Sequence, residues 1–519
     1  MSHEIQTHTF EDNYRRALAN PQLQKALSNA TTKFTTARKI SVSNVGEEWE
    51  ELRDRARAIK EQAIANLDRY LGEFSGNVER LGGHVFWARD GGEANDYITR
   101  LARDRGVKLA VKSKSMMTEE IELNHALAAV GVEAVETDLG EYIIQLAGER
   151  PSHIIAPAIH KTREEVSELF AEKLQVEPLH EIERMTQLAR RVLRERFAAA
   201  DMGVTGANFA VAETGTIVLV ENEGNIRLTN SLPRVHVALM GIEKVIPRFA
   251  DLATFLRLLP RSATGQQMSS YVSFLTGVKR SPAEEGPEEL HVVILDNGRV
   301  DMLANPHLRE SLYCIRCGAC LNICPVYQKI GGHAYGWIYP GPIGSVLTPQ
   351  LVGRERAADL PFASSLCGAC RQVCPIKINI PDMLLHLRHE IKEEAPAAHT
   401  GAGHAEGFAG AGKYHQTVTQ RASKLAEHAA IKFWAFAMRS AQRYRVGASL
   451  ARIAQQAFGN KLGPGPISRW TSTRELPPLA PRSFRDLWPE LSGASHTSGD
   501  GNSGSKPGAK RGGALGRQN

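Results

Sequence analysis

The sequence has no cysteine in its first 313 residues and none in its last 145, although seven cysteines fall between Cys314 and Cys374. A disulfide framework distributes its cysteines through the domain that it stabilises, so this clustering excludes one. Cysteines that are crowded into one short segment are typical of a metal site. The sequence therefore predicts that all seven serve a metal.

Long apolar runs are also missing. Charged residues interrupt the apolar stretches before they are long enough to cross a bilayer, as Lys432 and Arg439 do around residues 431–438. The first residues include acidic side chains and lack the apolar region of an export signal. We therefore expect a cytoplasmic protein without a transmembrane segment.

Motifs for binding nucleic acid are lacking too, although the formal net charge is +6. The positive charge is concentrated, since residues 411–490 hold 13 Lys or Arg against 4 Asp or Glu. A basic segment of this kind faces nucleic acid, an acidic partner or anionic lipid, and without a motif the first is least favoured. We expect no nucleic acid among the partners.

A chain of 519 residues exceeds what one hydrophobic core serves, which predicts two or three domains. The composition, with 42% apolar and 23% charged residues, is typical of globular proteins. The patterns indicate an N-terminal helical arm, an α/β domain, a cysteine-rich domain, a linker with a basic helical region, and a disordered tail. Their boundaries are 1–75, 76–300, 301–395, 396–490 and 491–519.

The α/β domain is indicated by strand-like apolar runs that alternate with helical patterns such as DYITRLARDRG and REEVSELFAEKL. This alternation predicts a parallel or mixed sheet with helices on its faces. The expected strands are HVFWA, KLAVKS, EAVET, HIIAPAI, TGTIVLV, HVALMGI and HVVILD. In the arm, helical spacing predicts one buried face made of Leu52, Ala56, Ile59, Ala63 and Leu67.

The spacing of the first cysteine run is the strongest signal. It spells C-x2-C-x2-C-x3-C-P, the run of bacterial ferredoxins, at Cys314, Cys317, Cys320, Cys324 and Pro325. Gly318 allows a tight turn that aims backbone N–H groups at sulfur. The fourth cysteine of such a run ligates a second cluster, so a second run is expected. The sequence provides one at Cys367, Cys370, Cys374 and Pro375.

The second run lacks one cysteine, since Ser364 stands three residues before Cys367. With ligands exchanged between runs as in two-cluster ferredoxins, the first cluster has four thiolates and the second has three. The first set is Cys314, Cys317, Cys320 and Cys374, and the second is Cys324, Cys367 and Cys370. The second cluster is then a [3Fe-4S] cluster, a [4Fe-4S] cluster completed by Ser364, His333 or another non-cysteine ligand, or one with an iron open to solvent or substrate.

Structural zinc is the alternative metal for these cysteines. Zinc also favours C-x2-C pairs, but it closes a tetrahedral site with four ligands from two separated pairs. Seven cysteines in two ferredoxin-like runs do not divide in that way, so iron-sulfur clusters are favoured.

Five stretches of the chain resemble the lactate utilisation protein B family. They are KSKSM, ETDLGEYIIQLAGERPSHIIAPAIHK, AETGTIVLVENEGN, CIRCGACLNICPVYQKIGGHAYGWIYPGPIG and LPFASSLCGACRQVCPIKI. The resemblance extends from near the N-terminus to about residue 490, and only the tail lies outside it.

The resemblance implies a cytoplasmic iron-sulfur protein of a three-component system that oxidises L-lactate to pyruvate. Its partners are then other lactate utilisation proteins and an electron acceptor that the sequence does not identify. The implied fold is an α/β LUD domain, with a mixed sheet flanked by helices and similar to the isomerase and CoA-transferase superfamily. A small α-helical two-cluster ferredoxin-like domain and a helical C-terminal extension follow.

The resemblance also bears on the cofactors. Family members have seven cysteines and are described as carrying two [4Fe-4S] clusters. Carried over to this chain, the ligands of each cluster are the two sets of cysteines given above. This favours a four-iron second cluster whose fourth ligand is not identified.

Polar residues of the LUD-like segment stand near strand ends, where α/β sheets bind ligands. The sequence KSKS before a helix is suited to an anion such as lactate or a phosphate, although polar strand ends are often only scaffolding. The candidates are Lys112, Lys114, Glu136, Asp138, Glu141, His153, His160, Glu213, Glu221, Glu223, Arg227 and His236.

Two further features have an ordinary reading and a functional one. His333 lies in GGHAYGWIYPGPIG, which we expect to pack over the clusters, and a bond to nearby backbone is favoured over ligation. The basic helix is suited to a membrane surface, but packing on the cluster domain or a partner is favoured. Its apolar residues are Phe433, Trp434, Phe436, Met438 and Tyr444.

The favoured function is an electron-transfer subunit that passes electrons from L-lactate through two clusters. Thiolate-bound clusters exchange one electron with little rearrangement, whereas oxidation of a hydroxy acid needs a base and a two-electron acceptor. The sequence has no flavin or nicotinamide fingerprint, so we assign no catalytic residue. The alternatives are an enzyme whose LUD domain itself oxidises a hydroxy acid, and a non-redox scaffold with structural clusters.

Overall fold

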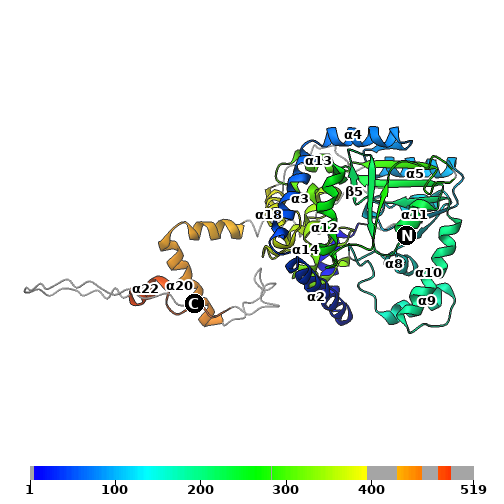
Figure 1. Cartoon of the computed structure of the whole chain (residues 1–519). Coiled ribbons are helices and arrows are strands. Elements are labelled where there is room, and N and C mark those ends of the chain that lie inside the picture. The colour runs from blue at the N-terminus through cyan, green and yellow to red at the C-terminus, as the bar shows by residue number, and fades with distance from the viewer. Residues whose placement is uncertain (1–4, 153, 282, 394–428, 459–476, 493–519) are drawn as a thin grey trace, which may run out of the picture. The chain divides into compact units, whose positions relative to one another are not determined.

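The structure is a computed structural model that describes residues 5–152, 154–281, 283–393, 429–458 and 477–492 (Figure 1). The chain divides into two compact units, residues 1–414 and 415–519. The first unit contains every cysteine and all the strands of the described residues. The predicted linker and the tail beyond residue 492 lie outside the described residues.

A six-stranded sheet forms the centre of the first unit, and all its strand pairs are parallel. In spatial order its strands are β1 (His84–Ala88), β10 (Glu289–Leu295), β7 (Val235–Gly241), β4 (Met202–Thr205), β2 (Leu109–Lys112) and β3 (Glu133–Glu136). A central parallel strand is buried on both faces and reads as a nearly continuous apolar run, as in VHVALMG of β7. The prediction of a parallel or mixed sheet is confirmed.

A second sheet of four strands is mixed. Its order is β8 (Val245–Ile246), β5 (Phe209–Val211), β6 (Thr216–Glu221) and β9 (Tyr271–Leu275). The sequence did not predict β4, β5, β8 or β9, because these strands are short or lack an apolar run. The expected strand HIIAPAI is wrong: residues 154–159 form bends and turns, and Pro157 within them removes a backbone donor that a strand interior needs.

Helices cover both faces of the large sheet. Side chains of a strand alternate between faces, so in β10 Val293 and Leu295 pack in one core while Val292 and Ile294 pack in another. The first face is covered by α5 (Gly91–Asp104), α6 (Met116–Glu120) and α7 (Leu123–Ala129). Near β2 and β3, the other face packs on α8 (Leu139–Ala147) and α10 (Ile182–Ala199), and α9 (Arg163–Leu174) packs on these two helices.

The N-terminal helices pack against both the second sheet and the cysteine segment. They are η1 (Thr7–Thr9), α1 (Phe10–Leu18), α2 (Pro21–Ser43), α3 (Glu48–Ala65) and α4 (Leu67–Arg80). The five residues expected on one face are all buried, but α3 ends at Ala65 and Leu67 begins α4, so the prediction of one helical face is confirmed for the other four. These helices share a core with α11 (Asn225–Ser231), η2 (Ile242–Lys244), α12 (Leu252–Ala263), which follows η3 (Phe249–Asp251), and the cysteines, so they are an integral part of the first unit.

The cysteine segment consists of short helices joined by turns. They are α13 (Arg299–Ala304), η4 (Arg309–Tyr313), α14 (Ala319–Ile323), α15 (Tyr327–Ile330), η5 (His333–Tyr335), α16 (Gly341–Val352), η6 (Leu360–Phe362), α17 (Ala369–Val373) and α18 (Ile380–Glu393). Figure 1 shows α14 and α18 on the same side of the unit as α2, α3 and α12, and contacts join α2 to α14 and α3 to η4. The long N-terminal helices therefore pack against a segment whose helices are mostly short.

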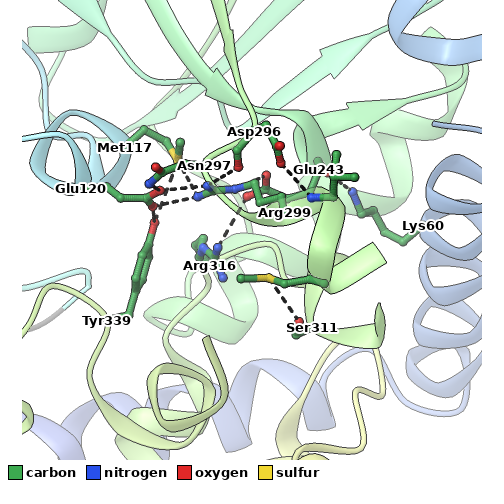
Figure 2. Close-up of polar contacts among 12 residues, drawn as sticks. Lys60, Met117, Glu120, Glu243, Asp296, Asn297, Arg299, Ser311, Arg316 and Tyr339 are labelled. Carbon is green, nitrogen blue, oxygen red and sulfur yellow. Dashed lines mark hydrogen bonds and ion pairs between the residues drawn. The ribbon is translucent and has the colours of Figure 1, made fainter. Parts of the chain in front are cut away.

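A buried ion network joins the LUD sheet to the cysteine segment (Figure 2). Arg299, at the start of α13, donates to Glu120 of α6 at 2.7 and 2.8 Å and to Glu243 of η2 at 2.9 Å. Tyr339 donates to Glu120 at 2.7 Å, and Arg316 lies 3.5 Å from Glu243. Although burial opposes it, the charges of Arg299, Lys244 and Arg316 lower the pKa of Glu243 to about 2.

The second unit contains a helical stretch over residues 429–438, α20 (Ala441–Phe458) and α22 (Phe484–Leu491). The five apolar residues singled out in the basic helix are all exposed within this unit. Arg452 of α20 donates to the carbonyl of Pro481 at 2.6 Å, which ties the helix to the Pro-rich segment. The helical part of the prediction is confirmed for these residues.

The buried network is expected to contribute strongly to stability. Replacement of Arg299 by Leu leaves Glu120 and Glu243 buried without their cation, which costs about 3–5 kcal/mol. The control is Arg163→Leu, whose ion pair with Glu164 is exposed to solvent and is expected to contribute little to stability. Anaerobic urea unfolding of both variants measures the difference, and equal losses of stability would contradict this account.

Candidate functional site

The two cysteine runs fold into the same local structure. In each, a residue with positive φ precedes a cysteine, a glycine with positive φ follows it, and a five-residue helix begins after the glycine. The φ angles are 58° at Arg316 and 55° at Leu366, then 75° at Gly318 and 82° at Gly368. Glycine adopts this left-handed conformation without strain, which explains its place in both turns.

Four thiols line one small cavity, and they come from both runs. They are those of Cys314, Cys317, Cys320 and Cys374, and the remaining wall is mostly isoleucine. Burial raises the pKa of Cys320, and the thiols of Cys317, Cys314 and Cys374 raise it further, in that order. Because metals bind thiolates, loading of this site releases protons that burial holds on the apo thiols.

The other three thiols lie near one another, and one of them is at the surface. Burial raises the pKa of Cys370 to about 11, with further contributions from Cys324 and Cys367. Cys367 is exposed, whereas Cys324 and Cys370 are buried. The N–H of Ala369 and the hydroxyl of Ser365 lower the pKa of Cys367. The two groups of thiols thus differ in their access to solvent.

Backbone N–H groups point at sulfur in matching places of the two runs. Such hydrogen bonds stabilise thiolates and tune the potential of a cluster. In the first run the N–H of Ala319 donates to Cys317 and that of Val326 donates to Cys324. In the second run the N–H of Ala369 donates to Cys367 and that of Ile376 donates to Cys374.

Two arginines of the N-terminal helices reach the end of the second run. Arg53 of α3 donates to the carbonyl of Cys374 at 2.8 and 3.0 Å, and Arg38 of α2 donates to that of Val373 at 2.8 Å. The charge of Arg38 is also close enough to the thiols of Cys317 and Cys374 for them to raise its pKa, against a larger lowering by burial. These cations favour thiolates in the inner group.

The described residues contain no group of three or more His, Cys, Asp or Glu side chains that could hold a single metal ion. In a cubane cluster each thiolate binds a different iron, so the four ligands need not converge on one point. The donor set of four thiols around an apolar cavity fits a cluster of this kind.

A larger cavity of about 300 Å³ borders the inner thiols. Its wall includes three residues of the KSKS stretch, Ser113, Lys114 and Ser115, and residues of the first cysteine run. The residues that line it include Ser113, Lys114, Lys244, Arg316, Cys317 and Tyr339. A single cavity therefore connects the carboxyl end of β2 with a cysteine of the inner group.

Several polar groups on this cavity are unpaired among the described residues. Arg316 Nη1 and Ser113 Oγ are buried without a hydrogen-bond partner in that part of the chain. Burial lowers the pKa of Lys244 to about 8, and burial with the nearby Asp138 raises the pKa of Glu223 to about 7. Lys114, in contrast, is paired with Glu141 at 2.6 Å. The cavity combines hydrogen-bond donors with groups that change charge near neutral pH.

The LUD residues singled out from the sequence do not form one site. The 300 Å³ cavity is lined by Lys114, Asp138, Glu221 and Glu223. A second cavity, of about 240 Å³, is lined by Lys112, Glu136 and Glu141. Lys112 Nζ lies 2.7 Å from Glu136 there, so these two charges are paired.

The other LUD candidates have structural partners or lie outside the described residues. His160 lies 2.7 Å from Glu149, Glu213 accepts from the N–H of Phe249 at 2.8 Å, and His236 lies 2.9 Å from Thr205. The backbone N–H of Arg227 donates to Glu221 at 2.8 Å. His153 is outside the described residues.

Sequence reasoning missed Lys244 and Arg316 as cavity residues, and it included Ser113 only as part of the KSKS stretch. Lys244 lies in the buried η2 and Arg316 between two cysteines, and neither stands at a predicted strand end. The one local signal was the serine of KSKS at position 113. Only the fold brings these three together.

The aromatic segment between the runs packs as expected beside the cysteines. Tyr335 and Tyr339 are fully buried, and the thiols of Cys324 and Cys320 are among the groups that raise the pKa of Tyr335, after burial. His333 faces elsewhere, with Nε2 2.6 Å from the carbonyl oxygen of Arg150 and its ring against His160.

Three family models match the chain. The LUD domain matches residues 71–295, the 4Fe-4S dicluster domain matches residues 310–378, and the C-terminal domain of lactate utilisation protein B matches residues 387–492. The cysteine segment is thus a 4Fe-4S dicluster domain, which agrees with the spacing of its thiols.

Curated relatives match nearly the whole chain. Lactate utilization protein B of Bacillus cytotoxicus is 42% identical over 494 residues, covering 94% of this chain and 98% of the relative. Lactate utilization protein B of Bacillus thuringiensis is 43% identical over 492 residues, with the same coverage of both chains. This chain belongs to the lactate utilization protein B family.

One solved structure, a DUF162 family protein from Deinococcus radiodurans, aligns with this member of the lactate utilization protein B family. The alignment covers 44% of this chain and 98% of that structure, at 13% identity and a TM-score of 0.25. These values are too low for a comparison of the two folds. Among the described residues, no helix combines the length and apolar character needed to span a membrane.

The lowered pKa of Lys244 is open to a direct test. A cavity amine with a pKa of about 8 is partly neutral, and hence nucleophilic, two pH units below an ordinary lysine. We expect amine-specific labelling of Lys244, followed by mass spectrometry, to reach half its maximum near pH 8. Labelling of this residue only near pH 10 would contradict the burial and charge assigned to it.

Proposed function

We propose that this protein is the iron-sulfur electron-transfer component of a system that oxidises L-lactate to pyruvate. Support comes from relatives named lactate utilization protein B that match along 94% of the chain. The observation that carries the electron-transfer role is the division of seven thiols into an inner group of four and an outer group of three. Thiolate-bound clusters in such surroundings exchange single electrons with little rearrangement.

Two four-iron clusters are proposed, one for each group of thiols. The first takes Cys314, Cys317, Cys320 and Cys374, and the second takes Cys324, Cys367 and Cys370 with a further ligand. This exchange of one cysteine between runs is the arrangement of two-cluster ferredoxins. The electrostatic neighbours of Cys320 and Cys370 fall into these same sets.

The proposed path for electrons runs from the inner cluster to the outer one. The inner thiols border the 300 Å³ cavity through Cys317, whereas Cys367 of the outer group is exposed. An exposed ligand brings a cluster close to a docked protein, and electron transfer falls off steeply with distance. The outer cluster is therefore the exit toward the electron acceptor.

Other features of the proposal rest on the family. The partners are the other lactate utilisation proteins of a three-component system, and the location is the cytoplasm. The LUD domain is inferred to share the fold of the isomerase and CoA-transferase superfamily. The domain boundaries at residues 75, 300, 395 and 490 are retained as proposals, although the first three regions pack into one unit.

The ligand exchange predicts which variants lose which cluster. Cys374→Ala should lose the same EPR signal as Cys320→Ala, although Cys374 belongs to the other run. Cys370→Ala should instead lose the signal that Cys324→Ala loses. Both pairs should lose electron transfer from lactate in the assembled system. If Cys374→Ala and Cys370→Ala lost the same signal, the exchange of ligands would be wrong.

A second candidate function is favoured by the cavity: the LUD domain itself oxidises a hydroxy acid. Lactate oxidation to pyruvate releases two electrons and two protons, so this function needs a two-electron acceptor, such as the dye or a bound cofactor, in addition to the two one-electron clusters. Arg316, Ser113 and Lys244 are suited to hold a carboxylate. Glu223, with a pKa raised to about 7, is suited to accept a proton.

Dye reduction by the purified protein separates the two functions. If the LUD domain is the enzyme, lactate reduces the dye without partner proteins, and Lys244→Met lowers kcat/KM by about 10-fold or more, because a hydrogen bond to a charged group contributes about 1.5–3 kcal/mol. The control, Lys173→Met on the exposed face of α9, should match the unsubstituted protein. Dye reduction that requires the partners would leave only the electron-transfer role.

A further inference from the structure

The repeated structure of the two cysteine runs assigns a position to Ser364. Aligned through their short helices, Cys317 corresponds to Cys367, Cys320 to Cys370 and Cys324 to Cys374. The position of Cys314 in the first run is then taken by Ser364 in the second. The second run therefore has an oxygen donor where the first has a sulfur donor.

The hydroxyl of Ser364 makes the same local contact as the thiol of Cys314. The backbone N–H of Arg316 donates to Cys314 Sγ at 3.4 Å, and that of Leu366 donates to Ser364 Oγ at 3.1 Å. Both donors lie two residues after the acceptor and have nearly equal positive φ. The backbone thus presents the side chains at positions 314 and 364 in the same way.

A separate contact fixes the loop that carries Ser364. Arg388 of α18 donates to the carbonyls of Ser364 and Pro361, both at 2.9 Å, and its guanidinium lies over the ring of Phe362. These contacts hold the loop through its backbone carbonyls, so they do not occupy the hydroxyl of Ser364.

The other residue considered from the sequence is held in a different place. His333 Nε2 lies 2.6 Å from the carbonyl oxygen of Arg150, and its ring packs edge-on against that of His160, with centroids 4.4 Å apart. Burial and the neighbouring His160 lower its pKa to about 4. These contacts tie His333 to the LUD domain rather than to the second run.

We propose that Ser364 Oγ is the fourth ligand of the second cluster, an inference that rests on the proposed two-cluster function. On binding iron the hydroxyl releases its proton to solvent, as each cysteine thiol does, and no oxidation or reduction accompanies the step. An alkoxide is a harder donor than a thiolate, so it favours the more oxidised iron. The two clusters of this protein consequently differ in potential, with the second lower than a cysteine at position 364 would make it.

The test is Mössbauer and EPR spectroscopy of anaerobically purified protein and three variants. The unsubstituted protein should contain two four-iron clusters. Ser364→Ala should convert the second one into a three-iron cluster, which gives an EPR signal in the oxidised state. Ser364→Cys should keep four irons and raise the potential of that cluster alone. Ser231→Ala is the control and should keep four irons, because the hydroxyl of Ser231 bonds to the carbonyl of Arg227 in its own helix, α11.

Each outcome has a distinct meaning. A four-iron second cluster with an unchanged spectrum in Ser364→Ala would overturn the assignment of Ser364 and leave the proposed function intact. A three-iron cluster in the unsubstituted protein would overturn it as well. Protein that contains no iron or acid-labile sulfide would overturn the proposed function, and this inference with it.

Discussion

The buried carboxylate of Glu243 holds two parts of the chain in a fixed relation. It follows β7 of the LUD sheet, and it pairs with Arg299 at the start of the cysteine segment and with Arg316 inside the first run. A buried carboxylate is tolerable only when cations and hydrogen bonds surround it, so displacement of the cysteine segment from the sheet would remove both arginine partners of Glu243. The geometry of the inner thiols relative to the cavity depends on this constraint.

The N-terminal helices add a second restraint at the opposite end of the site. Arg53 and Arg38 bond to carbonyls at the end of the second run, where Cys374 crosses to the inner group. The two short helices that follow the cysteine turns, α14 and α17, have five residues each, so bound metal is expected to add to the restraints on the seven thiols. The sheet, the long helices and the metal thus each contribute to fixing the positions of the ligands.

The inner and outer groups of thiols lie in different surroundings. The inner thiols lie in an apolar pocket next to a cavity with unpaired donors, and the outer group includes an exposed cysteine. Burial and nearby charge shift the potential of a cluster, so the two sites need not have equal potentials even with similar ligands. A difference in potential gives the flow of electrons a direction.

The cysteine runs were predictable from sequence because their spacing is local. The same spacing showed that Ser364 stands where the second run lacks a cysteine. Long strands such as β7 and β10 were predictable because buried parallel strands are continuous apolar runs. Short strands such as β5, and the turn at residues 154–159, were not, since pairing and Pro157 decide them rather than apolar content. The cavity was out of reach, because Lys114, Lys244 and Arg316 meet only through the fold.

The most direct measurement of the central claim is rapid-freeze EPR of the protein assembled with its partner proteins and mixed with L-lactate. The account predicts that signals of reduced clusters appear within a single turnover and decay when the electron acceptor is added. Oxidation of lactate while both clusters stay oxidised throughout would contradict it, because the clusters would then only hold the fold together.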